Sequence, residues 1–264
     1  MEVNRNMVDI FKDVGICPQF DCLWENLTPK EHLFLFGRMK GLRKQELSQS
    51  VAYFLQTMQL DFFKETKAGN LSGGNKRKLC VADALIGGPD LLFFDEPSTG
   101  LDPIARRFLW NTLSQSLKSR SSSIVLTTHS MIEAESLCDN IGIMVNGKLV
   151  CFGSTQDLKN KYGQGYLITI KPKPNNNVDD YIFDLYPKAL KNKNNKEGYV
   201  EFQVPLEAFS FFKTFNFLEK ELLEKNLIDD FSISQASLEQ IFLNFSKFQT
   251  GEEASNQFLD ATSK

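Results

Sequence analysis

Two adjacent glycines precede a segment with helical character, and this arrangement could bind phosphate. Residues 76–88 are predicted to form a helix, and directly before them stand Leu71, Ser72, Gly73, Gly74 and Asn75. Glycines at a helix start allow backbone N–H groups to approach an anion closely, and the helix dipole favours negative charge there. Taken alone, the pattern also fits a plain turn followed by a helix.

A pair of carboxylates after an apolar run could serve phosphate chemistry. Residues 91–94 are Leu-Leu-Phe-Phe, which predicts a buried strand, and Asp95 and Glu96 follow them. Open α/β sheets bind ligands at the carboxyl ends of their strands. Asp95 is therefore a candidate Mg²⁺ ligand, directly or through water. Glu96 is a candidate to orient or deprotonate a water that attacks a γ-phosphate. In isolation, the doublet also fits a solvated acidic pair before a turn at Pro97.

Two further polar residues follow predicted strands. His129 comes after the apolar residues 124–126, and an imidazole at the end of a strand can hydrogen-bond a γ-phosphate. Gln19 follows a strand that ends near Pro18, and its amide could contact both a metal ion and a water. Alone, each also fits an ordinary exposed side chain. The order and spacing of all four sites favour a shared phosphate site over coincidence.

The elements around these motifs indicate an α/β domain. From about residue 14 to 162, short apolar runs alternate with helical patterns and glycine-rich turns, which is typical of a mainly parallel sheet. Thr28 and Glu31 form a capping box, with proline at the first helical position between them. Asn146 and Gly147, between two apolar runs, predict a hairpin turn.

The sequence after residue 163 predicts a second, smaller domain. Its elements follow the order β-α-β-β-α-β, which is the outline of a ferredoxin-like α+β unit. A final capping box at Ser237 and Gln240 begins one more helix. We therefore expect one domain over residues 1–162, a second over 163–248 and a disordered tail over 249–264.

In combination, the motifs resemble the nucleotide-binding domain of ABC transporters over roughly residues 10–160. The matching motifs are the Q-loop glutamine Gln19, the signature LSGGN at 71–75, the Walker B strand LLFFD that ends at Asp95, the catalytic glutamate Glu96, the D-loop STGLD that ends at Asp102, and the switch histidine His129. Asn75 stands where the family signature has glutamine, so the amide is kept but is one methylene shorter.

The resemblance narrows to the A subfamily of ABC transporters, whose members are mostly lipid exporters. The segments CPQFDCLWENLTPKEHLFLFGRMKG, LSGGNKRKL and DEPSTGLDP are similar to that subfamily. Its members have a small regulatory domain after the nucleotide-binding domain, and the segment ISQASLEQIFLNFSK resembles the end of that domain. Bacterial ABC drug-export ATPases have related motifs and are the nearest alternative.

This resemblance implies a P-loop-NTPase-like fold that uses ATP and Mg²⁺. Family members pair two nucleotide-binding domains head to tail, with ATP between the P-loop of one and the signature of the other. Transmembrane domains, which this sequence does not contain, couple the pair to export and place it at the cytoplasmic face of a membrane. The implied roles are catalytic for Glu96, His129 and Gln19, nucleotide-binding for residues 71–75 and Asp102, and Mg²⁺-binding for Asp95 and Gln19.

The phosphate cradle of the family, G-x-x-x-x-G-K-[ST], has no match ahead of Gln19. Residues 142–148 approximate it, but Leu149 replaces Ser or Thr, and the segment lies in a predicted hairpin. We therefore expect a truncated module that binds ATP poorly and is nearly inactive alone. The alternative is a catalytically deficient half-site or regulatory binding module that acts with a partner nucleotide-binding domain. A soluble ABC ATPase of translation or DNA repair is disfavoured, because the sequence shows no second ATPase domain and no long heptad repeat.

Composition excludes several other classes of protein. The 264 residues have a formal net charge of −3, which argues against a nucleic-acid partner. No apolar run approaches the roughly 20 residues that a membrane-spanning helix needs. The five cysteines are scattered singly and there are only two histidines, so neither a disulfide scaffold nor a zinc site is expected.

Overall fold

The chain forms two compact units, residues 1–138 and 139–264, each with a hydrophobic core of its own. A computed structural model describes the chain except residues 1–6, 120–121, 164, 175, 193–197 and 247–264. The expected tail over 249–264 falls outside the described residues. The α/β class expected from the sequence is confirmed, since parallel strands alternate with helices in the first unit.

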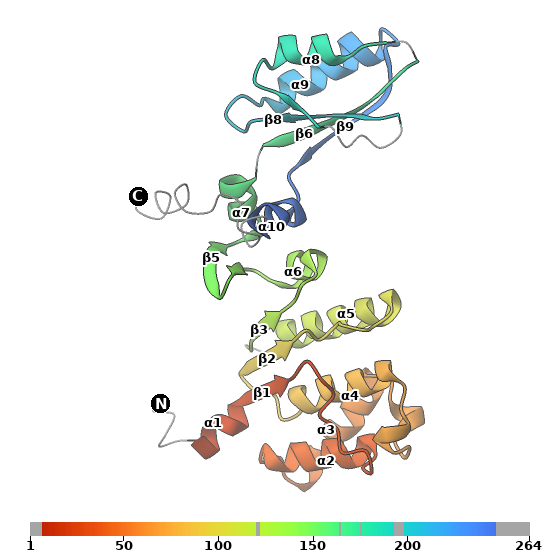
Figure 1. The fold of residues 1–264 in the computed structure, drawn as a ribbon. Coiled ribbons are helices and arrows are strands. Elements are labelled where there is room, and N and C mark those ends of the chain that lie inside the picture. Colours follow the sequence, from red (N-terminus) through yellow and green to blue (C-terminus); the bar gives the residue numbers. More distant parts are fainter. Residues whose placement is uncertain (1–6, 120–121, 164, 175, 193–197, 247–264) are drawn as a thin grey trace. The chain divides into compact units, whose positions relative to one another are not determined.

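The first unit contains a three-stranded parallel sheet and its helices (Figure 1). Its elements are α1 (Met7–Asp13), β1 (Val14–Cys17), α2 (Pro29–Met39), α3 (Lys44–Thr57), the 3₁₀ turns η1 (Asp61–Phe63) and η2 (Ala68–Asn70), α4 (Gly73–Leu85), β2 (Leu91–Asp95), α5 (Pro103–Ser119), β3 (Ser123–Thr127) and α6 (Met131–Leu137). The strands lie in the order β1-β2-β3, with Cys17 opposite Phe94 and Asp95 opposite Thr127.

Helices α2, α3 and α4 lie together beside β1 and share its core (Figure 1). The predicted capping box begins α2: the Thr28 hydroxyl accepts from the Glu31 amide at 3.3 Å, and the Glu31 carboxylate accepts from the Thr28 amide at 2.8 Å. Gly15 allows β1 to approach α4, because a Cβ atom at this position would lie 2.2 Å from the carbonyl oxygen of Ala84.

The second unit contains a β-hairpin, two helices that pack near it and a four-stranded antiparallel sheet. Its elements are β4 (Ile141–Val145), β5 (Lys148–Gly153), α7 (Thr155–Tyr162), β6 (Tyr166–Pro172), α8 (Asp179–Leu185), β7 (Leu190–Lys191), β8 (Val200–Val204), α9 (Phe211–Phe217), the π-helix η3 (Leu218–Leu223), β9 (Ile228–Gln235) and α10 (Leu238–Ser246). The sheet has the strand order β7-β8-β6-β9.

The units divide between Cys138 and Asp139, whereas the sequence predicted a boundary at residue 162. The reason is packing: α7 lies against β5 and against α10, so the hairpin and α7 group with the later residues. The hairpin itself forms as predicted, with Asn146 and Gly147 at φ 49° and 75°. Positive φ at both central residues matches the twist of the paired strands.

The second helix of the ferredoxin-like order changes type along its length. It begins at Phe211 as α9 and continues from Leu218 as the π-helix η3. Ahead of the helix, the ring of Phe209 stacks on Tyr166, with ring centroids 4.0 Å apart. The later capping box forms, since the Gln240 amide donates to the Ser237 hydroxyl at 3.2 Å and the Ser237 amide donates to the Gln240 side chain at 3.0 Å.

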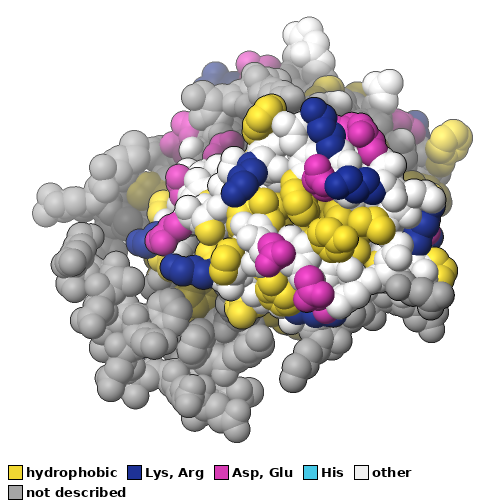
Figure 2. Space-filling view, turned by 90° about the horizontal axis from the view of Figure 1, so that it is seen from above, with side chains coloured by type: hydrophobic (Ala, Val, Ile, Leu, Met, Phe, Trp, Pro, Cys, Tyr) yellow, Lys and Arg dark blue, Asp and Glu magenta, His cyan; other side chains and the backbone are white. Residues whose placement is uncertain are grey.

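The helices that cover the four-stranded sheet carry exposed apolar side chains among charged ones, as Figure 2 shows from above. Beneath them, α8, α9 and η3 cover the buried residues of β6 and β8. The exposed apolar residues of these helices are Tyr181, Phe211, Phe212, Phe215 and Leu223.

Candidate functional site

The three parallel strands bring separate motifs to one edge of the sheet. Because β1, β2 and β3 run in the same direction, the residues after each strand meet at their carboxyl ends. Gln19 follows β1, Glu96 follows β2 and His129 follows β3. The side chains of Gln19 and His129 are exposed there, and Glu96 is partly buried. The edge that the sequence predicted as a ligand site therefore carries all three residues.

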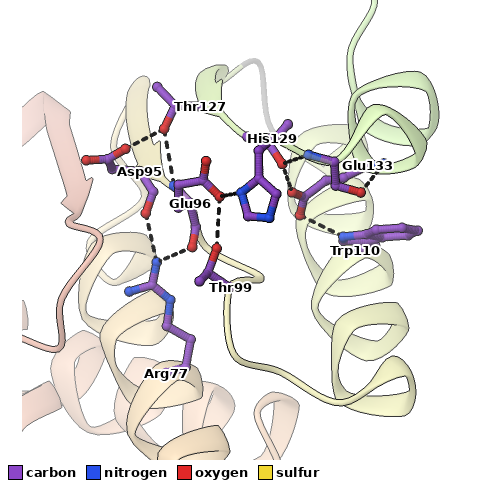
Figure 3. A network of polar contacts seen from close by, with 10 residues as sticks. Arg77, Asp95, Glu96, Thr99, Trp110, Thr127, His129 and Glu133 are labelled. Carbon is purple, nitrogen blue, oxygen red and sulfur yellow. Dashed lines mark hydrogen bonds and ion pairs between the residues drawn. The ribbon is translucent and has the colours of Figure 1, made fainter. Parts of the chain in front are cut away.

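Glu96 and His129 are in direct contact. His129 Nδ1 lies 2.7 Å from Glu96 Oε2, and the Thr99 hydroxyl donates to the same oxygen at 2.8 Å (Figure 3). The His129 side chain is 75% exposed and that of Glu96 is 18% exposed. The imidazole therefore faces solvent, while the carboxylate is partly sheltered. Both contacts use Oε2, and Oε1 can accept a hydrogen bond from a water.

The backbone of Glu96 adopts a conformation that side-chain-bearing residues rarely use, with φ at 47°. Its amide donates to the carbonyl oxygen of Thr127 at 3.1 Å and to the Thr127 hydroxyl at 3.2 Å. A left-handed conformation at a non-glycine residue costs of order 1 kcal/mol and persists only where the surroundings hold it. The contacts of Glu96 with β3, Thr99 and His129 supply part of that restraint.

Asp95, the last residue of β2, is exposed and is held on one side only. The Thr127 hydroxyl donates to Asp95 Oδ1 (Figure 3). An exposed carboxylate with its second oxygen available is chemically suited to a hard cation such as Mg²⁺. Within the described residues, no group of three or more His, Cys, Asp or Glu side chains could hold a metal by itself, so an ion here would need further oxygens from a ligand or from water.

The glycine motif forms the start of α4, as expected, but the helix runs over Gly73–Leu85, three residues earlier at each end than the predicted 76–88. Ser72 is the N-cap residue, and its hydroxyl accepts from the Asn75 amide at 3.3 Å. A Cβ atom at Gly73 would meet no atom within 4 Å, and one at Gly74 would meet only Leu101, at 3.9 Å. Packing within the chain therefore does not explain the two glycines, and an exposed helix start free of side chains remains open to an anion.

The remaining predicted residues have structural contacts of their own. Leu71 is buried, with 7% of its surface exposed, and packs in the core of the first unit. Asp102 is the residue before α5, and its carboxylate accepts from the amides of Ile104 and Ala105, each at 2.9 Å. A helix-capping role accounts for this contact without any ligand.

Two buried charged residues outside the predicted site, Arg77 and Glu133, hold the edge of the sheet. The guanidinium of Arg77 is buried and donates to the backbone carbonyls of Gln19 and Glu96. The buried carboxylate of Glu133 accepts from Trp110 and from Thr128, the neighbour of His129. The sequence carries little signal for Arg77, because it stands between Lys76 and Lys78 and a run of charges is usually exposed.

Comparison with known proteins decides the family. The family described as ABC transporter matches residues 2–99. ATP-binding cassette sub-family A member 2 of Rattus norvegicus is 42% identical over 252 residues, which are 94% of this chain and 10% of that protein. The retinal-specific phospholipid-transporting ATPase of Mus musculus is 40% identical over 251 residues, 92% of this chain and 11% of that protein. The chain belongs to the nucleotide-binding domains of A-subfamily ABC transporters.

A solved structure supports the same fold for this nucleotide-binding domain. An ATP-binding subunit of an ABC transporter superposes with a TM-score of 0.57 and 27% identity, over 61% of this chain and 67% of that one. The chain spans about a tenth of the length of the curated relatives it matches. Among the described residues, no helix has both the length and the apolar character needed to cross a membrane.

Proposed function

We propose that this chain is the ATP-hydrolysing module of an ABC transporter that exports a lipid. The Glu96–His129 contact at 2.7 Å carries the proposal, because it places a carboxylate and an imidazole where a γ-phosphate would meet the sheet edge. The lipid substrate is supported by the name of a relative, the retinal-specific phospholipid-transporting ATPase of Mus musculus. On this proposal, transmembrane domains outside this chain bind the lipid and hold the module at the cytoplasmic face of the membrane.

The residues at the edge would divide the chemistry of hydrolysis. Glu96 would accept a proton from the attacking water through Oε1, since His129 and Thr99 occupy Oε2. The exposed ring of His129 would contact the γ-phosphate. Asp95 and Gln19 would hold Mg²⁺, which neutralises charge on the phosphates when it is bound.

The start of α4 would act on a nucleotide held by a second nucleotide-binding domain. Its exposed N–H groups and the empty space around Gly73 and Gly74 suit the close approach of a phosphate. The N-cap Ser72, Leu71 and Asn75 complete this contact, and Asp102 lies in the loop that would face the partner. We infer a head-to-tail pair in which ATP binds between the two domains.

A second candidate function is a half-site or regulatory module without turnover of its own. The sequence favours it, because no segment matches the phosphate cradle and the one near match lies at residues 142–148. That segment runs through the β4–β5 hairpin, whereas a phosphate cradle joins a strand to a helix. In this alternative the chain would supply only its signature edge, and the partner would hold the phosphates.

We also infer that residues 163–248 form a ferredoxin-like regulatory domain. The order β6-α8-β7-β8-α9-β9 and the antiparallel sheet β7-β8-β6-β9 support it. The second unit begins at Asp139 and is larger than this domain, because it also contains the β4–β5 hairpin and α7.

The signature edge can be tested by reconstitution with a complete nucleotide-binding domain of the same transporter. ATP-dependent association, measured by analytical ultracentrifugation with Mg-ATP, should occur with the parent chain and disappear with Gly74→Asp. The new carboxylate adds bulk and a like charge beside the phosphate. The matched control is Gly74→Ala, which the surrounding space accommodates and which should keep most of the association. Undiminished association of Gly74→Asp would show that this edge is not the nucleotide-facing surface.

A further inference from the structure

Arg77 lies one helical turn after Gly73 on α4, and its side chain is almost entirely buried. Only 4% of the residue is exposed, although it carries a full positive charge. The nearest carboxylate is that of Asp21, whose Oδ1 atom lies 3.8 Å from Nη1. This single contact, with a partly exposed partner, is too long for a hydrogen bond. The guanidinium must therefore be held by other groups.

Those groups are five backbone carbonyls. Each N–H of the guanidinium matches one. Nε donates to Pro97 at 2.9 Å, and Nη1 donates to Pro18 at 2.6 Å and to Gln19 at 3.2 Å. Nη2 donates to Asp95 and Glu96, both at 2.9 Å (Figure 3). A guanidinium has five N–H donors in a rigid plane, so all its donors are used here. The acceptors belong to two separate segments, the turn after β1 and the end of β2.

This arrangement gives Arg77 control over the position of Glu96. The carbonyls of Glu96 and of its two neighbours all accept from this one side chain. Glu96 has the strained φ of 47°, which persists only while its surroundings hold it. Without the guanidinium, these carbonyls would lose the donors that Arg77 supplies, and the turn would be free to relax toward an unstrained conformation.

We propose that Arg77 is a positioning residue that sets the backbone of Gln19 and Glu96 relative to the phosphate-facing start of α4. The guanidinium spans from the signature helix to both turns, so the three parts of the site keep one fixed arrangement. Its effect on hydrolysis rests on the proposed function, because it acts through Glu96 and Gln19. Its effect on the backbone of the two turns does not.

Amide hydrogen exchange of the full chain tests the positioning role without any nucleotide. In Arg77→Ala, the amides of Glu96 and Thr99, which donate to Thr127 and Glu96 respectively, should exchange at least about tenfold faster. Amides in the middle of α5, near Leu109 and Leu113, should keep their protection. The matched control is Lys76→Met, which removes a charge from the neighbouring position of the same helix and should leave both sets of amides unchanged.

Chemical rescue distinguishes the loss of the five guanidinium hydrogen bonds from a general loss of stability in Arg77→Ala. Guanidinium at concentrations well below denaturing ones should enter the cavity of Arg77→Ala and restore slow exchange at Glu96 and Thr99, while ammonium should not. If Arg77→Ala does not fold, as judged by fluorescence of Trp24 and Trp110, Arg77→Lys replaces it. Lysine keeps the charge but has three donors at one atom, so faster exchange at both amides is again expected.

Unchanged exchange at Glu96 and Thr99 in the folded variants would overturn the proposal. So would faster exchange that is uniform across the first unit, or rescue by ammonium as well as by guanidinium. The association assay with a complete nucleotide-binding domain is run in parallel. Failure of the parent chain to associate would contradict the proposed function, whereas hydrogen exchange, which needs no nucleotide, would still decide the role of Arg77.

Discussion

The indole nitrogen of Trp110 donates a hydrogen bond of 2.8 Å to Glu133 Oε1 and so joins α5 to α6 behind His129 (Figure 3). The other oxygen of the same carboxylate accepts from the Thr128 hydroxyl at 2.5 Å. Glu133 is fully buried, with no exposed surface. Each oxygen therefore has its own donor, and the turn that ends in His129 is anchored on the side away from Glu96.

Replacing Glu133 with Gln should lower the free energy of unfolding of the first unit by about 1–3 kcal/mol. An amide has one acceptor oxygen, so it can serve Trp110 or Thr128 but not both, and one buried donor loses its partner. Tryptophan fluorescence in a denaturant titration measures this change, since both tryptophans, Trp24 and Trp110, belong to the first unit.

The control for this substitution is Glu65→Gln, the same chemical change at an exposed ion pair. Glu65 lies 3.1 Å from Lys30 Nζ, and its side chain is 66% exposed. Exposed pairs contribute about 0–1 kcal/mol, so Glu65→Gln should have a small effect. Equal losses from the two variants would show that Glu133 does not anchor the turn.

His32 and Asp83 form a buried pair that should make stability depend on pH. His32 Nδ1 lies 3.3 Å from Asp83 Oδ2, and the two side chains are 0% and 6% exposed. Burial raises the pKa of Asp83 from 3.8 to about 6, against the opposing effect of His32. Burial works against charge on His32, but the Asp83 carboxylate outweighs it and raises the pKa of His32 above 6.5.

Both pKa values are higher in the folded state than in the unfolded one, so the folded state binds protons more tightly. The contribution of the pair to stability is therefore present at low pH and is lost as pH rises, from about pH 4 to above pH 6.5. Relative to Asp83→Asn, the parent chain should lose stability between about pH 5 and pH 8. Denaturant titrations at several pH values measure the difference, and a difference that grows with pH would contradict this assignment.

Gly15→Ala should destabilise the first unit by about 1–3 kcal/mol. The added methyl group would lie 2.2 Å from the Ala84 carbonyl oxygen and 2.6 Å from Leu92 Cδ2, so α4 and β1 would have to separate. The comparison is Gly73→Ala, where the methyl group meets no atom within 4 Å and stability should stay the same or rise slightly. Similar denaturation midpoints for Gly15→Ala and the parent chain would show that α4 yields more easily than we expect.

The isolated chain should release phosphate from Mg-ATP at a rate near background. A well-placed base such as Glu96 accelerates a reaction by about 10²–10⁴-fold, but only on a phosphate that is already bound. The sequence has no G-x-x-x-x-G-K-[ST] cradle to bind it. A steady-state phosphate-release assay measures the rate, with Glu96→Gln as the control. Robust turnover that this substitution abolishes would indicate a phosphate site of a different kind.

Short-range patterns in the sequence were sufficient to predict the motifs and many boundaries of helices and strands. The capping box at Thr28 and the hairpin at Asn146 and Gly147 formed as predicted, because each depends on contacts between residues at most three positions apart. The apolar run before Asp95 likewise predicted a strand that ends at a ligand-binding edge, and β2 ends at that residue. The family resemblance followed from the same motifs.

Only the tertiary structure decided how these parts meet. The Glu96–His129 contact, the positive φ of Glu96 and the five carbonyls around Arg77 depend on strand register and on the packing of α4 against β1. The unit boundary at Cys138 also depends on packing, since α10 reaches back to α7. Such contacts join residues far apart in the chain. Their energy comes from burial and from paired donors and acceptors that exist only once the core has formed, and no local pattern encodes them.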